Sequence, residues 1–182
     1  ASMRDILGGK GANLAEMNKL GISVPPGFTI STKVCDYYYA YDKTFPDELK
    51  DQVNNSIKNI EEKPEFNFGG GKNPLLVSVR SGSRASMPGM MDTVLNLGLN
   101  DKTVIDLSTA SDDERFAFDS YRRFIQMYSD IVLGVPHSDF EEILEEEKIS
   151  NNVMLDTELT EESLDQLVKK YKEHVREKTK KD

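Results

Sequence analysis

The 182-residue sequence contains a single cysteine, Cys35, and two histidines. One cysteine excludes an internal disulfide framework and cannot by itself complete a cysteine-based metal site, so we expect Cys35 to be buried and unreactive. No apolar run approaches the roughly 18 residues of a membrane-spanning helix, and the N-terminus carries no apolar signal segment. These absences favour a cytoplasmic protein with no membrane partner, although an organelle is not excluded for some eukaryotes.

Basic residues are also scarce, since 23 Lys and Arg face 32 Asp and Glu for a net charge of −9. Such a chain repels nucleic acid unless it carries a local basic patch, and the sequence has none. The excess of acid lies entirely in residues 101–182, whereas 11 of the 12 glycines lie in residues 1–100. This change of composition predicts a domain boundary near residue 100, with an α+β domain at 1–100 and an all-helical subdomain at 101–182.

Element types alternate in the first hundred residues. The spacing of apolar residues predicts a helix from Ala12 to Leu20, and Gly21 is placed to end it. Leu75 to Val79 is the most strand-like run of the chain and predicts a buried central strand. A second strand is expected at Val94 to Leu97, after a linking segment rich in Gly, Ser and Met.

The second part of the chain shows helical patterns throughout. Helices are expected at residues 112–133 and 139–148, and Thr160 is placed to cap a last helix. The acidic run 145–147 is interpreted as a solvated helix face, because neighbouring carboxylates point in different directions around a helix and do not converge on a metal. His137 and His174 are interpreted as surface residues.

The first candidate for chemistry is a glycine-rich segment at residues 8–13 that places Lys10 at the start of a helix. Free N–H groups and the helix dipole favour an anion there, and the lysine adds a positive charge. The spacing fits neither a Walker A loop nor a dinucleotide-binding fingerprint. The alternative is a plain glycine turn with a solvated lysine.

The second candidate is Arg80, at the C-terminal end of the expected central strand, with the Gly/Ser/Met segment that follows it. The planar guanidinium suits a phosphate because it can donate two parallel hydrogen bonds, and backbone N–H groups of the segment could cover a polyphosphate. The alternative is a surface loop whose arginine pairs with a carboxylate. Binding a triphosphate requires positive charges, and a lysine and an arginine on separate glycine-rich segments would supply them together.

These motifs resemble the dikinases that make phosphoenolpyruvate, and pyruvate phosphate dikinases in particular. The resemblance is carried by Gly8–Met17, Val24–Thr32, Leu75–Asn100 and Arg115–Asp130, and it is weakest at 42–73 and 145–182. The Met-Pro-Gly-Met-Met-Asp-Thr stretch at 87–93 is less like the more distant relatives, phosphoenolpyruvate synthase and glucan water dikinase.

The resemblance implies an ATP-grasp-like fold for the front portion, which would be incomplete, and ATP and Mg²⁺ as cofactors. Lys10 matches the family's phosphate-contacting lysine, and Arg80 matches its essential, catalytic arginine. The family's glycine-rich loop over the nucleotide corresponds to Ser86, Met87, Pro88, Gly89, Met90, Met91, Asp92 and Thr93. In this family the β-phosphoryl group of ATP passes to a histidine on a swivelling domain, and a barrel domain uses it to convert pyruvate to phosphoenolpyruvate.

The sequence also departs from the family pattern. It has no Thr-Ser-His motif for the phosphorylated histidine, and the acidic Mg²⁺ ligands are expected beyond residue 182. We therefore expect an inactive N-terminal fragment whose partners are the phosphohistidine and pyruvate domains of a homodimeric parent enzyme. The alternatives are a nucleotide-sensing or interaction module that reuses the domain, a related phosphoenolpyruvate synthase, and a structural helical domain.

Overall fold

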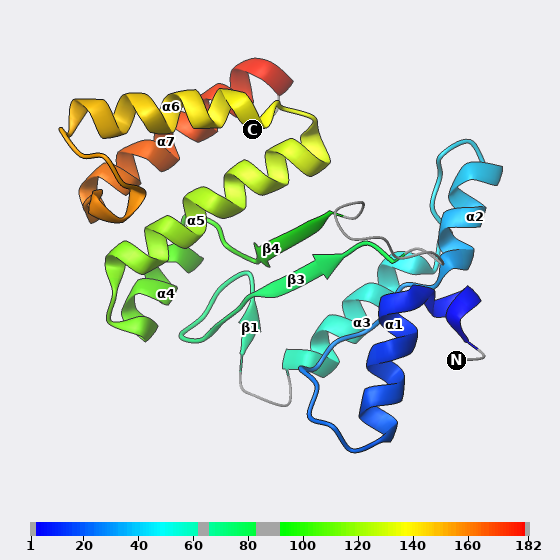
Figure 1. Cartoon of the computed structure of the whole chain (residues 1–182). Coiled ribbons are helices and arrows are strands. Elements are labelled where there is room, and N and C mark those ends of the chain that lie inside the picture. Colours follow the sequence, from blue (N-terminus) through cyan, green and yellow to red (C-terminus); the bar gives the residue numbers. More distant parts are fainter. Residues whose placement is uncertain (1–2, 62–65, 83–91, 181–182) are drawn as a thin grey trace. The chain divides into compact units, whose positions relative to one another are not determined.

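The computed structural model describes residues 3–61, 66–82 and 92–180 (Figure 1). It is mostly helical with two small sheets, which confirms the predicted α+β class. No helix among these residues has both the length and the apolar composition of a membrane span. In chain order the elements are α1 (Arg4–Lys19), α2 (Thr32–Ala40), α3 (Leu49–Glu61), β1 (Asn67–Phe68), β2 (Pro74–Leu75), β3 (Val77–Arg80), β4 (Thr93–Leu97), α4 (Thr103–Ser111), α5 (Glu114–Tyr128), the π-helix η1 (Ser129–Leu133), α6 (His137–Ser150), the 3-10 helix η2 (Asp156–Glu158) and α7 (Glu161–Thr179).

The chain divides into two compact units. Unit 1 comprises Ala1–Glu65 and Arg80–Thr93, and unit 2 comprises Phe66–Val79 and Val94–Asp182. The chain thus leaves unit 1, returns to it at the last residue of β3 and leaves it again after the first residue of β4. The domain boundary expected near residue 100 stays a prediction.

Helix α1 of unit 1 is interrupted at Gly8. This residue has φ 69° and ψ 173°, a backbone region confined almost entirely to glycine, so the helix stops and restarts at Gly9. The restarted helix ends as predicted at Gly21, which has φ 75°, and the Ile22 N–H donates to the Met17 carbonyl at 3.0 Å. The hydroxyl of Thr32, at the start of α2, donates to the carbonyl of Asp5 at 2.6 Å and links the two helices.

Unit 1 buries little apolar surface. Among its described residues only Gly8, Gly9 and Ala12 are buried. The expectation of a buried Cys35 was wrong, because this thiol is exposed on α2. The helices of unit 1 therefore present apolar side chains to solvent, and the described part of the unit has no hydrophobic core of its own.

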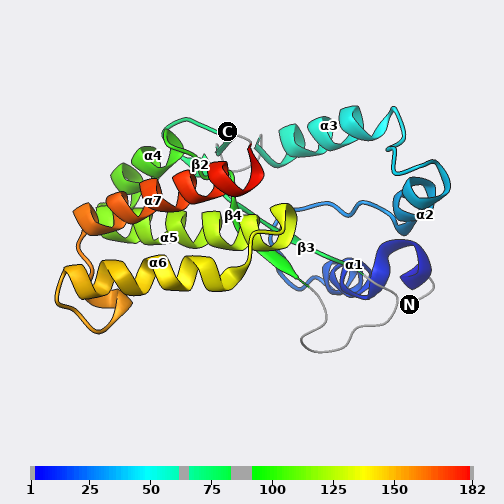
Figure 2. The ribbon, with the colours of Figure 1, turned by 90° about the horizontal axis from the view of Figure 1, so that it is seen from above.

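Unit 2 holds a helical core in which α5 packs against α4, α6 and α7, and α6 packs against α7 (Figures 1 and 2). Asp113 caps α5 by accepting a hydrogen bond from the Phe116 N–H, and Thr160 caps α7 as predicted. The helix expected at 112–133 is α5 continued by η1, whereas α4 was not predicted. The largest fully buried side chains of the core include Phe140, Leu164, Leu167 and Tyr171.

The strands form two separate pairs. β1 pairs with β2 in parallel, and β3 pairs with β4. The prediction of one buried central strand at 75–79 was wrong, because Leu76 separates β2 from β3 and Val79 is 49% exposed. Among the described residues β4 is the only partner of β3, whereas a central strand pairs with a neighbour on each of its two edges. The strand predicted at 94–97 is confirmed as β4.

Candidate functional site

Lys10 lies in the first turn of the helical segment that restarts after Gly8 in unit 1. Its side chain is half-buried, and the neighbouring Gly9 is buried. The N–H groups of a first helical turn lack regular partners four residues earlier, and the helix dipole makes this end positive. Lys10 therefore adds its charge at a position already suited to an anion.

Arg80 is the last residue of β3, and its side chain is exposed. The next residue, Ser81, donates from both its N–H and its hydroxyl to the carbonyl of Asp92, at 3.3 Å and 3.2 Å. These two bonds hold together the ends of the Gly/Ser/Met segment. Of the predicted loop residues, Asp92 is exposed and Thr93 is half-buried at the start of β4, whereas Ser86 to Met91 lie outside the described residues.

The two glycine segments meet within unit 1. A methyl group built on Gly8 would lie 3.1 Å from both the carbonyl carbon and the carbonyl oxygen of Gly82. The backbone that leads into Lys10 is therefore in direct contact with the backbone that follows Arg80. Neither cation forms an ion pair with a carboxylate among the residues that the structure describes, so the interpretation of Arg80 as one half of a surface ion pair has no support there.

The two histidines lie in unit 2, His137 on α6 and His174 on α7, whereas both glycine-rich segments belong to unit 1. His137 is largely exposed, with its ring nitrogens 3.4 Å from Glu141 and 3.6 Å from Asp130. His174 bonds Asp139 at 2.9 Å. The described part of the chain contains no group of three or more His, Cys, Asp or Glu side chains that could hold a metal ion.

One residue of the acidic run departs from its expected place on a solvated face. Glu147 is buried, and its Oε2 accepts from the Lys170 ammonium at 2.6 Å. Its Oε1 accepts from the Asn151 amide at 2.9 Å. The carboxylate thus connects α6 to α7, and its role is structural.

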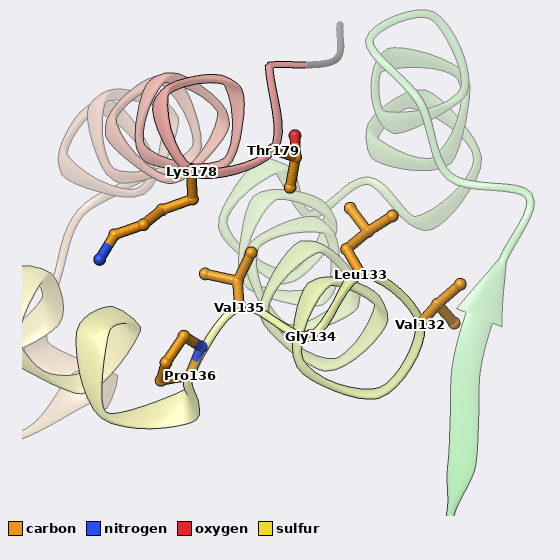
Figure 3. A pocket seen from close by; sticks show the side chains of 7 residues that line it. All are labelled: Val132, Leu133, Gly134, Val135, Pro136, Lys178 and Thr179. Atoms are coloured by element: carbon orange, nitrogen blue, oxygen red, sulfur yellow. The ribbon is translucent and has the colours of Figure 1, made fainter.

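A cavity of about 340 Å³ lies in unit 2 at the turn between η1 and α6 (Figure 3). Its only charged lining residue is Lys178, whose ammonium lies 3.1 Å from the Asp139 carboxylate. A phosphate would find this charge already neutralised, so the cavity is a poor candidate for a phosphate site. Its lining residues are Val132, Leu133, Gly134, Val135, Pro136, Lys178 and Thr179.

The Asp139 carboxylate contributes to the way the stability of unit 2 depends on pH. Hydrogen bonds from His174 and from Lys178 lower the pKa of Asp139. A carboxyl whose pKa is lowered by folding stabilises the protein above its unfolded pKa of about 4, and this contribution is lost as the pH falls through the folded value. We expect Asp139→Asn to lose less stability than the wild type between about pH 6 and about pH 3. Urea unfolding at both pH values checks this, and an equal loss in the two proteins would contradict it.

Comparison with known proteins shows that residues 4–63 match the family model described as "Pyruvate phosphate dikinase, AMP/ATP-binding domain". The chain is 54% identical over 172 residues to the pyruvate, phosphate dikinase of Clostridium symbiosum, and the match covers 94% of this chain. It is 54% identical over 177 residues to that of Rhizobium meliloti (strain 1021), and 51% identical over 170 residues to the chloroplastic enzyme of Flaveria trinervia. The chain belongs to the pyruvate phosphate dikinase family.

The chain spans about a fifth of the length of these curated dikinases. The matches cover 20%, 20% and 18% of the three relatives, and 94%, 97% and 93% of this chain. The family model covers the segment of Lys10 and ends before Arg80, whereas the pairwise matches extend over nearly all of the chain.

Three residues that matter for the geometry lie within the predicted segments of this chain but were not predicted as site residues. They are Gly8, Gly82 and Ser81, which bring the two segments into contact and hold the ends of the second one. The positive φ that Gly8 adopts could have been suspected from a glycine pair directly before the lysine. Its contact with Gly82, 74 positions later, leaves no trace in local sequence patterns.

Proposed function

We propose that the chain supplies part of the ATP site of a pyruvate phosphate dikinase. Lys10 and the first turn after Gly8 would bind phosphate oxygens from one side, and Arg80 with residues 86–93 (Ser86 to Thr93) would bind them from the other. The contact between Gly8 and Gly82 carries the proposal, because it places both segments at one location in a chain of this family. We further propose that residues 1–100 form the α+β part of an ATP-grasp domain, which would be incomplete, and that residues 101–182 form its helical subdomain.

The chemistry of the site follows from charge. Phosphoryl transfer depends mainly on positioning and on neutralising the phosphate oxygens. The Lys10 ammonium acts as a point charge, whereas the Arg80 guanidinium can hold two oxygens at once. A catalytic role for Arg80 would come from stabilising the charge of the transferred group.

We propose that the Mg²⁺ ligands lie outside this chain. The residues described here offer no group of three or more His, Cys, Asp or Glu that could hold a metal ion, so the site of Lys10 and Arg80 does not fit a resident metal on its own. What this part of the protein contributes is cationic side chains and backbone N–H groups.

The reaction of the whole protein is a proposal as well. A dikinase of this family would convert ATP, phosphate and pyruvate to AMP, pyrophosphate and phosphoenolpyruvate through a phosphohistidine. The sequence contains no Thr-Ser-His motif, so phosphohistidine and pyruvate domains elsewhere in a longer, homodimeric protein would be its partners, and the chain alone would be inactive. A nucleotide-sensing module would bind ATP equally well without those domains.

The proposed site predicts that Arg80→Ala weakens ATP binding about ten-fold or more. A hydrogen bond to a charged group contributes about 1.5–3 kcal/mol, and loss of the guanidinium removes up to two such bonds. Titration of the 182-residue chain with ATP, followed by backbone amide shifts, measures the effect. In the wild type, ATP is expected to shift the amide signals of residues 8–13 and 80–93. Lys10→Ala is expected to weaken ATP binding by a similar factor.

The matched control is Arg123→Ala, which removes the same charge from an exposed position on α5 of unit 2. It is expected to leave ATP affinity within about two-fold of the wild type, because Arg123 belongs to the other unit and its exposed side chain is paired with Asp119 at 3.0 Å. Equal affinities for wild type and Arg80→Ala, or shifts confined to unit 2, would overturn the placement of the site.

A further inference from the structure

Gly8 is the only described glycine of unit 1 that combines a positive φ with burial. Its φ of 69° and ψ of 173° lie in a region essentially confined to glycine. It is also buried, and a Cβ built on it would lie 3.1 Å from the carbonyl carbon and oxygen of Gly82 and 3.3 Å from its Cα. A side chain at this position would therefore meet backbone, which cannot move aside as the end of a side chain can.

The contact lies between the two proposed phosphate-binding segments. Gly8 is the last residue before the helical turn that carries Lys10, and Gly82 lies two residues after Arg80. On the Gly82 side, the bonds from Ser81 to Asp92 hold the chain in place. On the Gly8 side, the Thr32 hydroxyl donates to the carbonyl of Asp5. A Cβ built on Gly11 would lie 3.0 Å from the side chain of Thr29. Both partners of the contact are thus held by their own neighbours.

We propose that Gly8 is a positioning residue of the phosphate site: its missing side chain lets the Lys10 segment lie against Gly82, and this contact sets the spacing at which Lys10 and Arg80 bind one polyphosphate. The inference rests on the proposed function and adds a residue that touches no ligand itself. A methyl group at Gly8 pushes the two segments apart by a few tenths of an ångström or more. Because charged hydrogen bonds weaken steeply with misalignment, the two cations then bind the same ligand together less tightly.

Gly21 provides the matched control within unit 1. It has φ 75°, close to that of Gly8, but a Cβ built on it would meet nothing within 4 Å. Gly21→Ala therefore introduces an alanine at positive φ without displacing a neighbouring segment. Any effect of Gly8→Ala that Gly21→Ala does not share comes from the Gly8 backbone conformation and its contact with Gly82.

The test measures ATP affinity by amide shifts in the wild type, Gly8→Ala, Gly21→Ala, Arg80→Ala and the double variant Gly8→Ala/Arg80→Ala. Gly8→Ala is expected to bind about ten-fold more weakly, and Gly21→Ala within about two-fold of the wild type. A double-mutant cycle separates positioning from general destabilisation. If Gly8 acts by placing both cations, Arg80→Ala costs at least about three-fold less in the Gly8→Ala background than in the wild type. Additive losses, or equal losses in Gly8→Ala and Gly21→Ala, would overturn the inference while leaving the proposed function in place.

The contact itself is tested without nucleotide and without a variant. Close approach of the two backbones predicts a nuclear Overhauser effect between the α-protons of Gly8 and Gly82 in the wild-type chain, and its absence would overturn the inference even if Gly8→Ala failed to fold. In the variant, the amide of Gly82 is expected to shift, whereas Gly21→Ala leaves it unchanged. A wild-type chain that binds no ATP but shows this effect would refute the proposed function and, with it, the positioning role built on it.

Discussion

Replacing Arg122 with alanine is expected to lower the free energy of unfolding of unit 2 by about 3 kcal/mol. The side chain of Arg122 is only 4% exposed; its Nε donates to Asp119 at 2.8 Å and its terminal nitrogen to Asp156 at 2.9 Å. It therefore connects α5 to the 3-10 helix η2 through a guanidinium that is buried, although the Asp156 carboxylate is 36% exposed. Removing the guanidinium leaves a buried space and two carboxylates without this partner. Urea unfolding followed by far-ultraviolet circular dichroism measures the change.

The ionisation of Arg122 supports this expectation. Burial is the largest single influence and lowers the pKa of the guanidinium, but Asp119, Tyr171 and Asp156 together outweigh it, so the net effect raises the pKa further above its ordinary value. The side chain is thus charged at every pH at which the protein folds, and the loss in Arg122→Ala should be the same at about pH 6 and about pH 9.

The adjacent arginine is a natural control. Arg123 bonds the other oxygen of Asp119 at 3.0 Å, but its side chain is 56% exposed. An exposed ion pair contributes about 0–1 kcal/mol, so Arg123→Ala is expected to change stability by less than about 1 kcal/mol. Two variants that lose equal stability would show that burial does not decide the contribution of this arginine pair.

Amide hydrogen exchange is expected to differ by at least about 100-fold between the helices of the two units. The hydrophobic cluster of buried residues lies within residues 99–171, all in unit 2. In unit 1 the buried residues among those described are two glycines and an alanine. Helices without buried apolar contacts open easily, so amides of α1, α2 and α3 should exchange long before those of α5 and α7.

A core substitution provides the control for this experiment. Phe140 is fully buried, and its ring packs edge-on against that of Tyr171 at a centroid distance of 4.9 Å. Phe140→Ala is expected to cost about 3–5 kcal/mol and to speed exchange in unit 2, while exchange in α1 to α3 stays nearly unchanged. Similar protection in both units of the wild type would contradict the contrast in packing.

The contrast bears on the proposed function. A site built on a weakly packed unit gains order when a ligand binds it, and ATP that binds only the folded form stabilises that form. We therefore expect ATP to slow exchange in α1 more than in α5. The loosely packed unit is also the one that contains Lys10 and Arg80.

Local patterns were enough to predict several elements. Gly21 ends α1 because glycine adopts positive φ without cost, and Thr160 caps α7 because its hydroxyl accepts from the Ser163 N–H. The run at 94–97 was recognised as a strand from its apolar and β-favouring residues. Each of these signals depends on residues within four positions of one another.

Other features depended on distant contacts. Helix α4 was not predicted because its sequence follows a turn and has a weak apolar pattern. In the structure this helix packs against α5. Glu147 was assigned to solvent from its acidic neighbours, yet Lys170, 23 residues later, makes its burial possible. The run at 75–79 has the composition of a buried strand, but among the described residues β3 has only one partner, and Val79 stays exposed.

The candidate site, too, was predicted from local sequence only in part. Residue types alone pointed to phosphate at Lys10 and Arg80, because a lysine before a helix and an arginine after a strand are chemically suited to an anion wherever the chain folds. The contact between Gly8 and Gly82 was decided only by tertiary structure, since it joins residues that are 74 positions apart through backbone atoms common to all amino acids. Sequence records which side chains are present, and packing determines which of them meet.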